Sequence, residues 1–89
     1  MTATLRFWAA AREAAGAAEE TVRAATLGEA LAEAVRRRGG AQGGGAELQR
    51  VLARSSVLLD GVQVGRSAPD SVPLPDGAVI EILPPFAGG

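Results

Sequence analysis

The segment LPDGAVIEILPPFAGG, residues 74–89, decides the fold and the function that we expect. A Pro-Asp-Gly turn at 75–77 leads into residues 78–83, where side chains alternate between two faces. Such alternation is typical of a β-strand. Pro84 and Pro85 end the strand, because a proline ring cannot donate a hydrogen bond to a sheet and holds the residue before it extended. The sequence therefore predicts a closing strand that leads into a short tail.

The first strand of the chain is predicted from the same kind of pattern. Residues 2–10, TATLRFWAA, alternate as residues 78–83 do. Because side chains two positions apart share one face of a strand, each of these strands has one face suited to a core. We expect a helix to pack on the face that carries Leu5, Phe7, Val22, Ile80 and Ile82. Trp8, Val79 and Leu83 are then expected on the opposite face.

The remaining strands are predicted from shorter patterns. Residues 19–25, EETVRAA, alternate and predict a second strand, which residues 11–19 connect to the first through a short helical turn or loop. Residues 55–65, SSVLLDGVQVG, predict a hairpin, because the pair Asp-Gly at 60–61 suits a type I′ turn. Residues 66–77 are predicted to be loop.

The strongest helix signal lies in residues 26–40, TLGEALAEAVRRRGG. Thr26 is a natural N-cap, and Glu29 three residues later completes a capping box. The arginines at 36–38 suit the negative end of the helix dipole, and Gly39 is a suitable terminator. A partner-binding patch is the alternative role of these arginines, but electrostatics at the helix end accounts for them.

Residues 39–46, GGAQGGGA, are predicted to form a flexible connection to a second, short amphipathic helix at 46–53. A phosphate-binding loop is the alternative, but the lysine and the hydroxyl residue of such loops are missing. Together these elements predict an α+β domain with a mixed sheet of four to five strands, packed on one main helix plus a short second helix.

The composition excludes most catalytic chemistry. The chain of 89 residues contains no Cys, His, Tyr or Lys, so that thiol nucleophiles, histidine bases and thiolate or histidine metal sites are excluded. We expect no bound metal, no bound cofactor and no enzymatic activity of the chain alone. The net charge of −1 gives no basis for binding nucleic acid or an anionic membrane. No apolar run is long enough to span a bilayer and no signal peptide is evident, which favours a cytoplasmic protein.

The sequence resembles the MoaD/ThiS family of small sulfur-carrier proteins, which have the β-grasp (ubiquitin-like) fold. The likeness covers LRFWAAAREAAG, LLDGVQV and LPDGAVIEILPPFAGG, and the last segment, with its double proline and terminal Gly-Gly, is the most specific. The double proline is more similar to the MoaD branch, the small subunit of molybdopterin synthase. The resemblance implies a β-grasp domain at 1–83 and an extended, flexible tail at 84–89.

The resemblance also implies the chemistry. The carboxylate of Gly89 would be adenylated by an E1-like adenylyltransferase of the MoeB/ThiF type, which uses ATP, and then converted to a thiocarboxylate. The sulfur would pass to a substrate held by a partner such as the large subunit MoaE. The tail residues that would enter these partners are Pro84, Pro85, Phe86, Ala87 and Gly88.

A docking surface is expected beside the tail. In the β-grasp fold the first and last strands run parallel, so Trp8 and Leu83 would both lie near the end where the tail leaves the domain. With Val79 they would form an apolar patch for a partner, since tryptophan is enriched at interface hot spots. The alternative is that a loop of the same chain covers Trp8.

Three other functions stay open from the sequence. A carrier of this kind could supply sulfur for thiazole, cysteine or secondary-metabolite synthesis. The chain could also be a ubiquitin-like modifier joined through Gly89 to lysines of other proteins. A passive binding module is the third, and it predicts that loss of Gly88 and Gly89 changes nothing.

Overall fold

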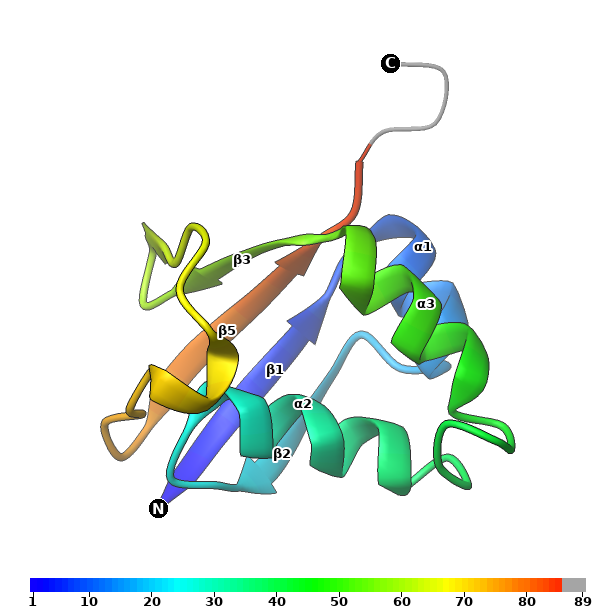
Figure 1. The fold of residues 1–89 in the computed structure, drawn as a ribbon, viewed down its shortest axis with the longest axis horizontal. Helices are drawn as coiled ribbons and strands as arrows, with labels where there is room; N and C mark the ends of the chain where they lie inside the picture. The colour runs from blue at the N-terminus through cyan, green and yellow to red at the C-terminus, as the bar shows by residue number, and fades with distance from the viewer. Residues whose placement is uncertain (86–89) are drawn as a thin grey trace.

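The structure, a computed structural model, describes residues 1–85, and these form a five-stranded mixed sheet with strand order β2-β1-β5-β3-β4 (Figure 1). The strands are β1 (Thr2–Phe7), β2 (Glu19–Arg23), β3 (Ser56–Leu59), β4 (Val62–Gln63) and β5 (Ala78–Leu83). β5 runs parallel to β1 and antiparallel to β3, and the other neighbouring pairs are antiparallel. The predicted parallel pairing of the first and last strands is confirmed.

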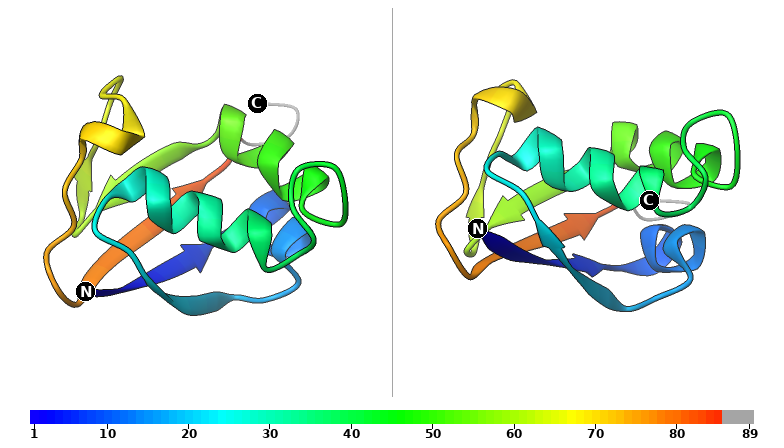
Figure 2. Two further views of the ribbon diagram at one scale, coloured as in Figure 1. Left: turned by 60° about the horizontal axis from the view of Figure 1, so that its bottom comes forward. Right: turned by 90° about the horizontal axis from the view of Figure 1, so that it is seen from below.

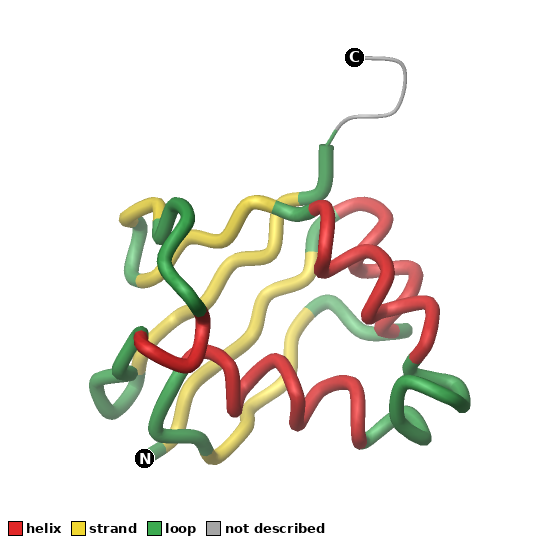
Figure 3. The backbone as a smooth tube through the Cα atoms, in the orientation of Figure 1, coloured by secondary structure: helices red, strands yellow, loops and turns green. Residues whose placement is uncertain are grey.

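Three helices and a short 3-10 turn complete the domain. They are α1 (Ala9–Ala15), α2 (Leu27–Arg36), α3 (Ala46–Arg54) and η1 (Pro69–Ser71). α2 and α3 lie over one face of the sheet, whereas the other face is open (Figures 2 and 3). This arrangement is the α+β β-grasp fold that the sequence predicts.

The core lies between the sheet and the helices. Leu5 and Ile80 lie opposite each other on the parallel pair β1–β5, and neither has any exposed surface. All five residues expected on the covered face are buried, namely Leu5, Phe7, Val22, Ile80 and Ile82. The alternation in the sequence therefore identified the buried face correctly.

The capping box of α2 is also confirmed. The Oγ1 atom of Thr26 accepts a hydrogen bond from the backbone N–H of Glu29 at 3.2 Å. In return, Oε1 of Glu29 accepts a hydrogen bond from the N–H of Ala25 at 2.7 Å. The first bond satisfies an amide group that the first turn of a helix leaves without a partner. The second holds Ala25, the residue before the N-cap, against the helix.

The first strand is shorter than the alternation predicts, and a helix follows it directly. β1 ends at Phe7, Trp8 is the N-cap of α1, and Ala9 has a positive φ of 50°. The alanine-rich run favours a helix, which ends at Gly16 in the left-handed conformation. Ala9 therefore does not continue the strand.

The glycine-rich stretch is a packed turn, so the prediction of a flexible connection is wrong. The N–H groups of Gly43 and Gly45 both donate to the carbonyl of Gly40, at 3.1 and 3.0 Å. A Cβ atom on Gly44 would lie 2.5 Å from the carbonyl oxygen of Arg38. Glycine is needed because neighbouring backbone occupies the space of a side chain.

The three arginines at the end of α2, residues 36–38, make specific contacts that the helix dipole does not explain. Arg36 pairs with Glu33 on the exposed face of the helix. Arg37 donates to the carbonyl of Thr21 at 2.9 Å on the outer edge of β2. Arg38 reaches under the helix to Glu20, with an N–O distance of 2.6 Å. Arg37 and Arg38 therefore tie the end of α2 to β2.

The long connection from β4 to β5 is held at two points. Pro73 forms an isolated bridge with Thr26. The carboxylate of Asp76 accepts hydrogen bonds from the backbone N–H of Thr2 at 2.9 Å and from its hydroxyl at 3.3 Å. These bonds from Thr2 hold the pKa of Asp76 below its usual value, because they favour the ionised form. The connection is thus joined to the start of β1.

Candidate functional site

The candidate site is the end of the sheet at which β5 releases the chain. Leu83 is the last residue of β5 and pairs with Ser56 of β3. Pro84 is partly buried and Pro85 is exposed beyond it. Pro84 and Pro85, which we call the tail root, therefore follow a central strand of the sheet, which lies between β1 and β3 (Figure 1). The predicted tail residues Phe86, Ala87, Gly88 and Gly89 lie outside the described residues.

Trp8 lies next to the tail root. Its backbone N–H donates to the carbonyl of Ile82 at 3.2 Å, which continues the β1–β5 ladder by one residue. Trp8 is in the extended conformation, so its side chain lies on the face opposite to that of Phe7. That side chain is 47% exposed. No loop of residues 1–85 therefore covers Trp8 fully.

Two of the three predicted docking residues lie close together, and the third does not. Phe7 pairs with Ile82, so Trp8 and Leu83 are level with each other one position further along. Val79 pairs with Thr4, at the other end of β5. Leu83 lies four residue steps along the strand from Val79, a distance of about 13 Å. On the open face, Trp8 and Leu83 therefore form a small group of apolar residues at the end where the tail leaves the sheet.

Charged residues divide this open face. Glu81 lies opposite Arg6 in the register of β1 and β5, between the positions of Val79 and Leu83. Glu81 also pairs with Leu58 of β3, which is partly buried on the same face. Leu58 extends this apolar group toward the hairpin of β3 and β4. The sequence pattern did not predict it as a docking residue. Leu58 alternates with Val57 in β3, and this alternation indicates the face on which Leu58 lies. In a strand of four residues, however, alternation is a weak signal.

A small cavity of about 280 Å³ adjoins Trp8. Two arginines contribute to its wall: Arg12 from α1 and Arg6, whose guanidinium lies 3.5 Å from the carboxylate of Glu19. Trp8 and Phe7 supply the aromatic part of the lining. The tail end of the domain thus combines an exposed indole with Arg12 and the ion pair of Arg6 and Glu19, which suits a partner surface that is both apolar and polar.

The described part of the chain offers no alternative reactive centre. Residues 1–85 contain no group of three carboxylates that could hold a metal ion. No helix among them is long and apolar enough to cross a membrane.

Known proteins share this architecture. The model of the ThiS family matches residues 5–89. Subunit 1 of the molybdopterin-converting factor of Helicobacter pylori, solved in a complex with subunit 2, is 25% identical with full coverage of both chains and a TM-score of 0.68. The HVO 2177 protein of Haloferax volcanii is 29% identical, with 100% of this chain and 87% of that chain covered and a TM-score of 0.70.

The small archaeal modifier protein 1 of Methanosarcina acetivorans has a TM-score of 0.78 at 20% identity, with 99% of this chain and 96% of that chain covered. At this identity the likeness shows the fold alone. No protein among the curated sequences matches the chain significantly.

Proposed function

The chain belongs to the ThiS family of small ubiquitin-like sulfur carriers and modifiers, and from this premise we propose that it carries sulfur for molybdopterin biosynthesis. The reacting group is the carboxylate of Gly89. An E1-like adenylyltransferase joins this carboxylate to the AMP part of ATP and releases pyrophosphate. Hydrosulfide then displaces AMP, which leaves the thiocarboxylate and a proton. The thiocarboxylate afterwards donates its sulfur to a substrate on a partner enzyme.

The composition supports a role in which partners supply every catalytic group. An α-carboxylate has a pKa of about 3.3–3.7 and is ionised at neutral pH, which makes it a poor electrophile. The sequence has no Cys, His or Lys with which to activate it. Glycine at 88 and 89 suits entry into a narrow active site, because the absence of Cβ permits close approach of ATP and of the enzyme backbone.

The observation that carries the proposal is the position of the tail root. β5 is a central strand, held on both sides by β1 and β3, and it ends beside the exposed Trp8. Pro84 and Pro85 follow at once and reduce the number of conformations that are lost on docking. Six extended residues from 84 to 89 reach about 20 Å at most, which is enough to enter a deep active site. A rigid origin and a short reach together favour delivery of the terminus.

The molybdopterin pathway is favoured by one relative. The Helicobacter pylori protein in complex with subunit 2 of the molybdopterin-converting factor covers the whole chain at 25% identity. We therefore propose that the acceptor is a MoaE-like large subunit that binds Trp8, Leu83 and the tail, and that Val79 belongs to the outer part of this surface. Thiazole, cysteine and secondary-metabolite synthesis remain alternatives, as does protein modification, and the cytoplasm remains the predicted location.

The test of the carrier is a direct chemical measurement. The protein is incubated with ATP, an E1-like adenylyltransferase and sodium sulfide, treated with iodoacetamide, and examined by fragment mass spectrometry. Replacement of oxygen by sulfur changes the mass by nearly as much as oxidation of Met1 or Trp8, so the adduct must be localised. Because the sequence has no cysteine, an alkyl group on Gly89 identifies a thiocarboxylate. A chain that lacks Gly88 and Gly89 is the control. No adduct with an enzyme that charges a known relative would refute sulfur carriage.

The same preparation distinguishes the alternatives. Transfer of the sulfur to molybdopterin precursor in the presence of a MoaE-like subunit supports the proposed pathway. Accumulation of the chain in larger conjugates, in which residues 67–89 stay joined through Gly89 to lysines of other proteins after trypsin cleaves at Arg66, would support the modifier function instead.

A further inference from the structure

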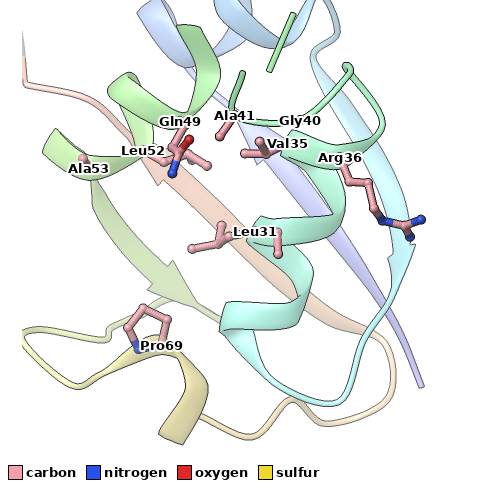
Figure 4. A pocket seen from close by; sticks show the side chains of 10 residues that line it. Leu31, Val35, Arg36, Gly40, Ala41, Gln49, Leu52, Ala53 and Pro69 are labelled. Carbon is pink, nitrogen blue, oxygen red and sulfur yellow. The ribbon is translucent and has the colours of Figure 1, made fainter. Parts of the chain in front are cut away.

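A groove runs over the helical layer, away from the open face of the sheet, and its far part reaches Ser55 and Ser56 near the tail root. Its first part is a cavity of about 540 Å³ between α2 and α3. Leu31 and Val35 form one wall, and Leu52 and Gln49 form the other (Figure 4). Pro69 of η1 closes one end, and Gly40 and Ala41 lie at the other (Figure 4). The volume is within the range of sites that hold ligands, about 300–1,000 Å³.

The groove continues beyond Pro69. A second cavity of about 420 Å³ lies next to it and reaches the loop that follows β4. The two cavities share four lining residues, namely Leu31, Leu52, Ala53 and Pro69. Leu27 lines the second cavity and Arg36 the first. The groove thus follows α2 from Leu27 to Arg36, nine residue steps or roughly 14 Å at the rise of an α-helix.

The walls are apolar, and their small residues permit close approach. Leu31, Val35 and Leu52 are only partly buried, although they pack against the core. Ala32 and Ala53 stand on the exposed sides of α2 and α3 and line the groove. The distance between two packed helices depends on the side chains at their contact, so alanine allows another helix to lie close.

The charge of the groove lies at one end. Its charged lining residues are two arginines and no carboxylate. The guanidinium of Arg36 points away from the groove (Figure 4) and pairs with Glu33. Arg66 is exposed in the loop after β4 and has no ion pair within residues 1–85. Asp70 lies nearby, but its carboxylate is against Gly28 at the start of α2.

We propose that this groove binds an amphipathic helix of a partner protein, with apolar residues on α2 and α3 and an acidic residue at Arg66. Binding of a helix in an apolar groove is a common mode of recognition. The groove is long enough for about nine residues of helix. Arg66 at one end would orient the bound helix, because its acidic residue would lie at that end. Since the groove lies on the helical layer and Trp8 is exposed on the open face of the sheet, a helix bound in the groove leaves the open face available to a second partner.

The test uses a designed probe. It is a fluorescein-labelled helical peptide of about twelve residues, long enough to span the groove, with leucines on one face and two glutamates at one end. Fluorescence anisotropy measures its affinity, and amide chemical shifts locate its site. A peptide in which lysines replace the glutamates is the matched control. We expect saturable binding that shifts the amides of Leu31, Leu52 and Ala53, and a lysine peptide that binds at least tenfold more weakly.

Variants of the protein complete the test. Ala53→Glu places a carboxylate on the exposed wall of the groove, and we expect at least a tenfold loss of affinity for the probe. Ala32→Glu does the same from the opposite wall, so a folding defect in one variant does not decide the result. Ala10→Glu on the exposed side of α1 is the matched control and should bind normally. Arg66→Ala should remove the preference for the glutamate peptide.

Four results would overturn the proposal. The first is no saturable binding of the probe, and the second is equal binding of the glutamate and lysine peptides. The third is equal loss of binding in Ala10→Glu and Ala53→Glu. The fourth is a dimer of the wild-type chain in sedimentation that Ala53→Glu dissociates, because the groove would then hold a second copy of this chain.

Discussion

Replacement of Arg38 should destabilise the domain far more than replacement of its neighbour Arg36. The side chain of Arg38 is 16% exposed and that of its partner Glu20 is 15% exposed. Two guanidinium nitrogens of Arg38 meet the two carboxylate oxygens of Glu20, at 2.6 and 3.2 Å. The same guanidinium donates to the carbonyls of Ala15 and Ala34, at 2.8 and 2.7 Å. Arg38 thereby joins α1, β2 and α2.

The magnitude follows from these contacts. Loss of one partner of a fully buried ion pair costs about 3–5 kcal/mol, because the other charge stays buried without compensation. Some exposure of both side chains, and the approach of Arg37 to Glu20 with an N–O distance of 3.8 Å, lower this cost. We expect about 2–4 kcal/mol for Arg38→Met. The methionine keeps apolar volume near Phe7, whose ring centre lies 5.6 Å from the guanidinium carbon. In a domain of this size the melting temperature should fall by roughly 10–25 °C.

Arg36→Met is the matched control. It has the same chemistry and a neighbouring position, but the Arg36 side chain is 76% exposed and its pair with Glu33 is within one helix. Pairs of this kind contribute about 0.3–0.5 kcal/mol. Urea unfolding, followed by the fluorescence of Trp8, gives both free energies. A double-mutant cycle with Glu20→Gln measures the pair itself. If Arg38→Met and Arg36→Met lost equal stability, the assignment of Arg38 as the link between three elements would be wrong.

Four further outcomes are expected. Trp8→Ala should weaken binding of a MoaE-like subunit by about thirtyfold without lowering the melting temperature, measured by calorimetry with Val62→Ala as the exposed control. Gly44→Ala should lose about 1–3 kcal/mol in urea unfolding, because its Cβ would meet the carbonyl of Arg38. The pKa of Asp76 is lowered, so wild type should exceed Asp76→Asn in stability above about pH 4 and lose this advantage as the pH falls further, in urea titrations over pH. Arg37→Ala should expose the edge of β2 and increase self-association in light scattering, because the carbonyl of Thr21 loses its donor.

The sequence predicted those features that depend on neighbouring residues. The capping box of Thr26 and Glu29 needs residues only three apart. The turn at Asp60 and Gly61, with φ of 49° and 85°, depends on two residues that tolerate positive φ. Both are local, and both were correct.

The features that the sequence did not predict depend on distant contacts. The pair of Arg38 and Glu20 joins residues 18 positions apart, and only the folded chain brings them together. The glycine-rich stretch has the composition of a linker, and its role becomes visible only when the carbonyl of Arg38 lies where a Cβ of Gly44 would be. For the docking surface, alternation gave the face of Val79 and Leu83, but only the strand pairing shows that Arg6 and Leu58 flank Glu81 between them.

The choice of residues around the tail root is consistent with a terminus that becomes reactive. An acyl adenylate is an electrophile, and nucleophilic side chains of the same chain would compete with sulfur for it. The sequence has no cysteine and no lysine, so hydroxyl groups are the main side-chain competitors. Ser55, close to the root, donates its hydroxyl to the carbonyl of Val51 at 2.7 Å, and an alcohol without a base is a weak nucleophile. A carrier of this composition should therefore keep its activated end until a partner acts on it.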